Sequence, residues 1–216
     1  MRPYSIIPSH TNKICYLILP QGVSRDLDEA LNVLAKAYDV TLVLLEQVDW
    51  NDDLTPWPAP GVFKKAKPFG GRAHEYLRRL CAETIPPVEA SLQVTDAHRT
   101  LLGVSLSGLF AVWTAFNTDI FSHIISISGS LWYDGFTEWA QTQRLSPQVK
   151  RICLLLGDRE KNSKERRMAT VEHNTRIVAD ILTEKGDGAV RFELVEGTHF
   201  SPIMPRIEKA FSFVFS

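Results

Sequence analysis

Short apolar runs rich in β-branched residues alternate along the chain with longer segments in which apolar residues recur at helical spacing. The apolar runs predict strands over 13–19, 40–46, 99–104, 123–127, 151–156 and 190–195. The longer segments predict helices over 24–37, 72–92, 106–116, 136–143, 168–184 and 205–214. This alternation is typical of an α/β fold with a mainly parallel sheet and helices on both faces. Pro86 and Pro87 are expected to break or kink the second helix.

One long segment, 48–70, fits neither pattern and contains four prolines. Loops of this length in a compact domain are commonly functional or disordered. The aromatic residues Trp50, Trp57 and Phe63 argue against disorder, because disordered segments are poor in aromatics. We therefore expect an ordered, functional loop.

The chain length and the net charge limit the number of domains and the kind of partner that we expect. A chain of 216 residues is long enough for one sizeable core, and we expect a single domain over 1–216. With 24 Lys and Arg against 25 Asp and Glu, no global field favours nucleic acid or an anionic membrane, so the expected partner is a small molecule. Nothing in the pattern indicates the oligomeric state.

Residues 1–12 lack the apolar core of a signal peptide, and the apolar stretch 14–19 is too short to span a bilayer. Three cysteines cannot all pair within one chain, and Cys15 and Cys153 lie in apolar runs. These features favour a reducing, cytoplasmic location.

The third predicted strand leads directly into the hexapeptide Gly-Val-Ser-Leu-Ser-Gly at 103–108, and a helix follows. A strand that turns tightly at a serine and opens a helix is a nucleophile elbow, which identifies Ser105 as a candidate nucleophile. The structural alternative is a helix that is capped by a serine between two glycines. A serine hydroxyl is a poor nucleophile at neutral pH, so catalysis requires a neighbouring base and donors for the oxyanion.

Candidate partners for Ser105 follow two other strands. Asp158 and Glu160 come after the fifth predicted strand, and His199 comes after the sixth. The carboxyl ends of parallel strands share one edge of a sheet, so these side chains are expected to converge. The order nucleophile, acid, base is the one that α/β-hydrolases use.

His199 is the candidate base by elimination. The other five histidines occupy expected surface or helix positions, or precede strands at the opposite edge: His10, His74, His173, His98 and His123. A general base must exchange its proton near neutral pH, which imidazole does. A single histidine is more commonly structural, and it is its place in the chain order that favours catalysis here.

Two carboxylates compete for the role of the acid. Glu160 lies three residues beyond Gly157, far enough for its side chain to turn toward an imidazole. Asp158 follows the glycine directly, where an aspartate commonly caps the turn. We favour Glu160, with Asp158 as the alternative.

An oxyanion hole in this fold takes one N–H from the residue after the nucleophile and one from the loop after the first strand of the α/β pattern. The candidates are Leu106 and either Gln21 or Gly22, since Pro20 has no N–H.

Two aromatic clusters lie beside this edge of the sheet. Trp50 and Trp57 belong to the 48–70 loop, and Trp132 and Tyr133 follow the fourth strand. We expect them to line the substrate pocket, although aromatics serve equally well in loop packing. No zinc-binding helix, Cys-x-x-Cys pair or phosphate loop occurs, so no metal or other cofactor is predicted.

With these motifs in place, the chain resembles the esterase family of α/β-hydrolases that includes esterase D-like and enterochelin (siderophore) esterase-like members. The resembling stretches are Asp-Leu-Thr-Pro at 53–56, Phe-Gly-Gly at 69–71, Ile-Pro at 85–86, the elbow with Ser-Gly-Leu at 107–109, Ser-Gly-Ser-Leu-Trp at 128–132 and Gly-Thr-His-Phe at 197–200. The resemblance implies ester hydrolysis by Ser105 and His199 and says less about the acid, since some members manage with a weak or absent third residue.

Two features depart from the family pattern. Ser107 stands where the elbow normally has its second glycine, and we expect serine to be small enough for close packing of helix against strand. Taking Ser107 as the nucleophile would place Ser105 and Leu109 at the glycine positions, which fits worse. The N-terminus also leaves room for only one strand before the first helix, so we expect a hydrolase core shortened at this end.

The sequence therefore predicts a serine hydrolase that cleaves a carboxylic ester through an acyl-enzyme. Thioesterase, amidase or acyltransferase chemistry with the same residues is the alternative. A non-catalytic binding protein on a hydrolase fold is the alternative from another class, and it would be expected to have a broken triad.

Overall fold

The computed structural model describes residues 3–20 and 24–216. Its main sheet has seven strands in the order β1-β3-β2-β6-β7-β8-β9. β1 runs antiparallel to β3, and every other neighbouring pair is parallel. The strands are β1 (Tyr4–Ile7), β2 (Lys13–Ile18), β3 (Thr41–Leu45), β6 (His98–Val104), β7 (His123–Ile127), β8 (Arg151–Gly157) and β9 (Ala189–Val195).

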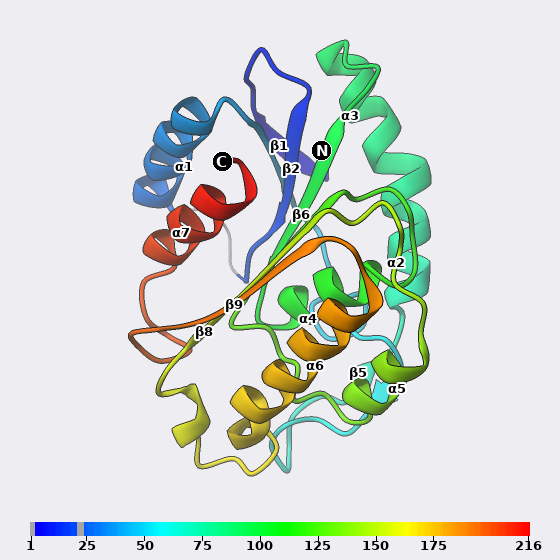
Figure 1. The fold of residues 1–216 in the computed structure, drawn as a ribbon, viewed down its shortest axis with the longest axis vertical. Helices are drawn as coiled ribbons and strands as arrows, with labels where there is room; N and C mark the ends of the chain where they lie inside the picture. The colour runs from blue at the N-terminus through cyan, green and yellow to red at the C-terminus, as the bar shows by residue number, and fades with distance from the viewer. Residues whose placement is uncertain (1–2, 21–23) are drawn as a thin grey trace.

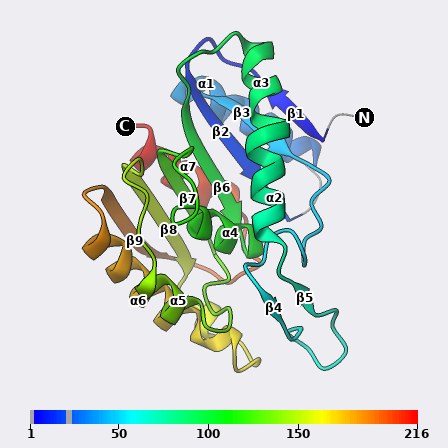
Figure 2. The same ribbon diagram turned by 90° about the vertical axis from the view of Figure 1, so that its right-hand side faces the viewer.

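Helices cover both faces of this sheet (Figures 1 and 2). One face carries α1 (Arg25–Tyr38) and α7 (Met204–Val214), which pack over an apolar layer that includes Leu31 and Phe211. The other face carries α2 (Ala73–Arg79), α3 (Ile85–Leu92), α4 (Leu106–Thr114), α5 (Phe136–Thr142) and α6 (Val171–Lys185). The central strands β2, β3, β6, β7 and β8 are therefore buried between two apolar layers, as their continuous apolar character predicts.

All six predicted strands are present, but the expectation of a single strand before the first helix is wrong. β1 precedes β2 and pairs with β3, with Tyr4 opposite Leu45 and Ile7 opposite Leu42. β1 has only four residues, none of them fully buried, and lies at the edge of the sheet. A short edge strand shows no continuous apolar run, so the pattern used for the central strands misses it.

The predicted helix over 72–92 is interrupted as the prolines require. A π-helical turn, η1 (Leu80–Thr84), separates α2 from α3. Pro86 and Pro87 follow it in the first turn of α3. The N–H groups of a first helical turn have no partner within the helix, so a proline there removes no hydrogen bond. The wider turn thus absorbs the prolines while the helical path continues.

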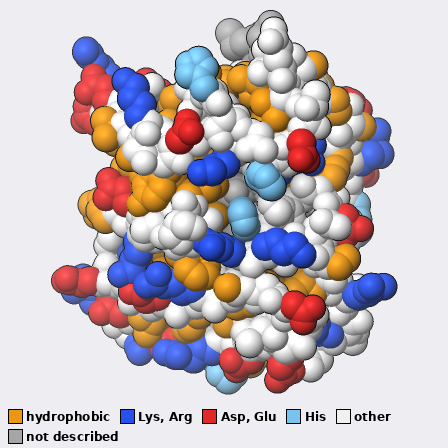
Figure 3. Space-filling view, turned by 45° about the horizontal axis from the view of Figure 1, so that its top comes forward, with side chains coloured by type: hydrophobic (Ala, Val, Ile, Leu, Met, Phe, Trp, Pro, Cys, Tyr) orange, Lys and Arg blue, Asp and Glu red, His pale blue; other side chains and the backbone are white. Residues whose placement is uncertain are grey.

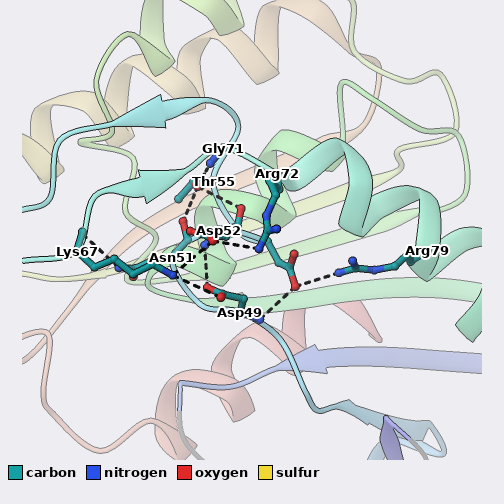
Figure 4. A network of polar contacts seen from close by, with 9 residues as sticks. Asp49, Asn51, Asp52, Thr55, Lys67, Gly71, Arg72 and Arg79 are labelled. Atoms are coloured by element: carbon teal, nitrogen blue, oxygen red, sulfur yellow. Dashed lines mark hydrogen bonds and ion pairs between the residues drawn. The ribbon is translucent and has the colours of Figure 1, made fainter.

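The 48–70 segment is ordered and forms a short ladder between β4 (Pro58–Ala59) and β5 (Phe69–Gly70). A polar network connects the segment to both ends of α2, through Arg72 before the helix and Arg79 at its last position (Figure 4). Asp52 accepts from Arg72 at 3.0 Å, and Asp53 accepts from Arg79 at 3.0 Å. At its centre the Thr55 hydroxyl donates to a backbone carbonyl at 2.7 Å and accepts from the Gly71 N–H at 3.0 Å.

Replacing Thr55 with valine should destabilise the protein by about 1–3 kcal/mol. The substitution conserves shape and leaves two partly buried backbone groups, the Asn51 carbonyl and the Gly71 N–H, without their hydroxyl partner. The free energy of unfolding in urea measures the effect. Thr142→Val is the matched control, because the Thr142 hydroxyl bonds a carbonyl at an exposed site and its loss should cost less than about 0.5 kcal/mol. Equal losses in the two variants would show that the network does not stabilise the segment.

The surface carries charges of both signs. On the face shown in Figure 3, Lys and Arg side chains are interspersed with Asp and Glu, in keeping with the formal net charge of −1. Within residues 3–20 and 24–216, no helix has the length and apolar character needed to cross a bilayer.

Candidate active site

The hydrogen-bond ladder of the sheet continues just beyond the carboxyl ends of its strands. The N–H of Ser105 donates to the carbonyl of Ile127 at 3.1 Å, and that of Ser128 donates to Leu155 at 2.7 Å. The N–H of Asp158 donates in the same way to Val195 at 2.8 Å. The residues that follow β6, β7 and β8 therefore stand side by side at one edge, as parallel topology predicts.

Ser105 lies in a strained turn between β6 and α4. Its φ of 60° and ψ of −121° are unusual for a residue with a side chain. A Cβ on Gly103 would lie 1.9 Å from the Ser107 carbonyl oxygen, and one on Gly108 would lie 2.9 Å from the Cα of Gly129. Only glycine fits these two positions, so the hexapeptide allows α4 to pack tightly against the sheet and holds Ser105 at the turn.

Ser107 is fully buried, and its small side chain adds bonds that glycine would lack. Its hydroxyl accepts from the Val104 N–H at 2.7 Å. The carbonyl oxygens of Ile18 and Val104 lie within its donating range at 2.6 and 2.8 Å. Ser107 thus connects the turn to the end of β2.

The structure brings Ser105, His199 and Glu160 together. His199 Nε2 lies 3.1 Å from Ser105 Oγ, and His199 Nδ1 lies 2.9 Å from Glu160 Oε2. A carboxylate only accepts, so Nδ1 carries the proton of the neutral ring and Nε2 is left to accept from the serine. This is the connectivity by which a general base withdraws a proton from a serine hydroxyl.

Asp158, the alternative acid, does not contact the imidazole ring. Its Oδ1 accepts from the N–H of Gly197 at 2.9 Å and lies 3.9 Å from Arg159 Nε. Its side chain is 47% exposed. Asp158 therefore links the loop after β8 to the loop that carries His199, which is close to the turn-capping role considered for it.

Glu160 belongs to the short helix η2 (Glu160–Asn162), and its side chain is only 4% exposed. Its Oε1 accepts from Ser128 Oγ at 2.6 Å and from the Gly157 N–H at 2.8 Å. Burial by itself raises the pKa of a carboxyl group. The hydrogen bonds from His199, Ser128 and Gly157 outweigh it, so that the pKa of Glu160 lies below its ordinary value.

This lowered pKa predicts a contribution of Glu160 to acid stability. A carboxyl whose pKa falls on folding stabilises the native state above its unfolded value, about 4.3, and loses that contribution as the pH falls through the folded value. The free energy of unfolding should therefore fall less steeply between about pH 5 and pH 3 in Glu160→Gln than in the wild type. Parallel curves from urea titrations would contradict the lowered pKa.

The sequence analysis missed Arg206, a buried cation at this site. Its Nη1 donates to Ser128 Oγ at 2.6 Å and lies 3.3 Å from Glu160 Oε1, and its Nη2 donates to the Thr198 carbonyl at 2.8 Å. A signal was available, because Arg206 shares helical spacing with Ala210 on the buried stripe of α7. A cation in an apolar stripe requires a buried partner.

Of the three candidate oxyanion donors, the structure describes Leu106. Leu106 is the first residue of α4, and the N–H groups in a first helical turn have no partner within the helix. Gln21 and Gly22 lie outside the described residues.

A cavity of about 360 Å³ adjoins His199 and Glu160. Trp132, Met168 and Val171 line it with apolar surface, and Arg159 contributes a cation. Of the four aromatic residues expected at the substrate pocket, Trp132 is thus beside the site.

The other three aromatic residues, Trp50, Trp57 and Tyr133, are not among the described residues that line this cavity. Tyr133 is buried, and its hydroxyl donates to the Trp57 carbonyl. The Trp57 ring packs on Phe136 and donates through Nε1 to the Asp134 carbonyl at 2.9 Å. Trp50 is half-buried and packs against the main core. These contacts are those of loop packing.

No cluster of three or more His, Cys, Asp or Glu side chains that could hold a metal ion occurs in the described part of the chain. Cys15, Cys81 and Cys153 are free thiols.

The sheet order, the helices on both faces and the residues at the carboxyl edge define an α/β-hydrolase fold, and solved structures agree. A crystal structure of an IroE-like serine hydrolase from Shewanella oneidensis superposes with a TM-score of 0.76 at 20% identity, covering 98% of this chain and 75% of that one. The siderophore hydrolase EstA from Aspergillus nidulans gives a TM-score of 0.70 at 20% identity, covering 94% and 82%. At this identity the likeness concerns the fold.

Residues 26–200 match the profile of the Esterase family, described as "Putative esterase". The chain therefore belongs to this family. It is also similar to the uncharacterized protein YbbA of Bacillus subtilis, with 30% identity over 151 residues. That match covers 68% of this chain and spans 60% of the length of YbbA.

Proposed function

We propose that the protein hydrolyses a small-molecule carboxylic ester through an acyl-enzyme on Ser105. The observation that carries this proposal is the continuous relay from Ser105 Oγ to His199 Nε2 at 3.1 Å and from His199 Nδ1 to Glu160 Oε2 at 2.9 Å. It is supported by membership of the Esterase family. A non-catalytic protein on this fold would have no need to keep all three groups in contact.

In the proposed mechanism Ser105 Oγ attacks the ester carbonyl carbon while His199 Nε2 takes the hydroxyl proton. The carbonyl π electrons move onto oxygen, and the resulting oxyanion is bound by the Leu106 N–H and an N–H of Gln21 or Gly22. Collapse of the tetrahedral intermediate releases the alcohol, which receives the proton from His199. Water, deprotonated by His199, then attacks the acyl carbon, and collapse of the second tetrahedral intermediate releases the carboxylic acid while His199 returns the proton to Ser105 Oγ.

Glu160 acts by orienting the ring and stabilising the imidazolium that forms. Its buried carboxylate faces Nδ1, so the charge that develops on the ring is balanced at 2.9 Å. Because Glu160 is ionised well below neutral pH, it is ready for this role throughout the working range.

A panel of substrates tests the type of bond. p-Nitrophenyl esters should be hydrolysed with a burst equal to the enzyme concentration, and acyl-thioesters and anilides of the same acyl group should react more slowly. Faster turnover of thioesters or anilides would favour the thioesterase or amidase alternative, and product formed only with an added alcohol would favour an acyltransferase. EstA of Aspergillus nidulans is named as a siderophore hydrolase, so siderophores are a sensible addition to the panel.

The rate should rise with pH through the range in which an imidazole, a group whose pKa in model peptides is about 6.5, loses its proton. Only the unprotonated ring can accept the proton of Ser105, so acid suppresses catalysis. The pH profile of kcat/KM for p-nitrophenyl acetate, read on the protein while it remains folded, measures this. A flat profile from pH 5 to pH 8 would argue against His199 as the base.

Three free thiols agree with the cytoplasmic location inferred from the sequence, since oxidising compartments favour disulfides. The near-balanced charge supports a small-molecule partner over nucleic acid or an anionic membrane surface.

A further inference from the structure

We propose that Arg206 is a positioning residue of this site, which neutralises Glu160 and ties the acid-bearing loop to the histidine-bearing loop so that His199 remains an unprotonated base. This inference deepens the proposed function and rests on it. Arg206 contacts neither the reacting serine nor the imidazole, so its effect on catalysis acts through Glu160 and the backbone beside His199.

The contacts of Arg206 join three segments that are distant in sequence. Its guanidinium extends from α7 to Ser128 after β7 and to Glu160 after β8. Its second terminal nitrogen bonds the carbonyl of Thr198, the residue directly before His199. A planar guanidinium with several fixed donors can hold these partners at once, which an ammonium group cannot do.

Two glycines provide the space for this group. A Cβ on Gly157 would lie 2.9 Å from Arg206 Nη2 and 2.6 Å from the Gly197 carbonyl oxygen. Gly197 has a φ of 127°, and a Cβ there would lie 3.0 Å from the same nitrogen. At both loops the guanidinium occupies space that a side chain on the glycine would fill, which indicates a specific site for this group.

The charge balance explains why the cation matters. Arg206 and Glu160 are 5% and 4% exposed, so water screens neither charge well. With Arg206 present, the carboxylate and the guanidinium cancel while the imidazole is neutral. Without it, the buried carboxylate would have His199 as its nearest possible cation and would favour the protonated ring. A protonated imidazole cannot take the proton of Ser105.

The division of the carboxylate oxygens supports the same role. Oε1 is occupied by Ser128, Gly157 and Arg206, and Oε2 is left to His199 Nδ1. Other charged groups on the neighbouring elements are engaged in their own pairs: Asp158 with Arg159, Lys161 with Glu172, and Lys209 with Glu193. Arg206 is therefore the cation that faces Glu160 from α7.

The test compares Arg206→Met, which removes the charge, with Arg206→Lys, which keeps it. Two readouts are needed, namely the pH profile of kcat/KM for p-nitrophenyl acetate and the protonation of the His199 ring followed by NMR in protein with 13C-labelled histidine. Arg206→Met should move both midpoints to higher pH by about one unit, so that kcat/KM falls by about tenfold at pH values below both midpoints and by less near neutral pH. Arg206→Lys should leave the midpoints near the wild-type position while lowering the limiting kcat.

Midpoints unchanged in Arg206→Met, or equally displaced in Arg206→Lys, would overturn the proposal and leave Arg206 a purely structural residue. Arg25→Met is the matched control, because Arg25 is 91% exposed on α1 and should change neither readout. If Arg206→Met does not fold, Arg206→Gln carries the same test with a neutral side chain that still bonds. The NMR titration decides the role of Arg206 even if the wild-type protein hydrolyses no ester, so the two failures are distinguishable.

Discussion

Replacing Ser105 with alanine should lower kcat by about 10⁶-fold and abolish labelling by a fluorophosphonate probe. The substitution removes the only atom that would bond to the substrate carbon, and His199 is left with no proton to withdraw. The side chain is half-buried at a strained turn, so stability should be unchanged or slightly higher. Gel fluorescence of the labelled protein and single-turnover hydrolysis of a p-nitrophenyl ester measure the loss.

Ser107→Ala is the matched control. Ser107 lies two residues away, and its hydroxyl bonds the backbone of β2 and β6 rather than His199. Its removal should cost about 1–3 kcal/mol of unfolding free energy while the folded protein is still labelled. Labelling that survives in Ser105→Ala and disappears in Ser107→Ala would reverse the assignment of the nucleophile.

Replacing Glu160 with glutamine should lower kcat by about 10³ to 10⁴-fold with little change in KM. The amide cannot balance the imidazolium charge, and it can turn its NH₂ toward the ring and stabilise the wrong tautomer. Stability should also fall, by about 3–5 kcal/mol, because Arg206 is left as a buried charge without its partner. Rates must therefore be expressed per folded molecule.

Asp158→Asn separates the two carboxylates considered for the acid. The Asp158 side chain accepts from a backbone N–H and is partly exposed, and an asparagine oxygen can keep that bond. We expect a loss of less than about tenfold in kcat. If Asp158→Asn had the larger effect, the relay through Glu160 would be the wrong one.

Much of the fold was predictable because its central strands are buried on both faces. Central strands such as β6 and β8 present continuous apolar runs, and these are found without any knowledge of their neighbours. β1 was missed because an edge strand of four residues makes no such run. The π-helical turn before Pro86 was anticipated only as a break, since proline excludes a regular hydrogen-bond pattern without specifying its replacement.

The part of the site that depends only on strand order was predictable. Ser105, Glu160 and His199 each follow a parallel strand, so their strand order alone predicts that they meet. Trp57 and Tyr133 follow the same edge, but their rings pack on one another and into the core, which depends on side-chain directions that a linear pattern does not contain. Arg206 was missed because a cation in an apolar helical stripe indicates that a buried partner exists but does not indicate which residue that partner is.

The sequence by itself determined the family, the alternation of strands and helices, and the strand ends from which the candidate catalytic groups extend, because these depend on local periodicity and chain order. Only the tertiary structure decided that Glu160 rather than Asp158 contacts His199 Nδ1, and that Arg206 stands behind that carboxylate. The reason is physical, since both results depend on distances between side chains that are 39 and 46 residues apart along the chain.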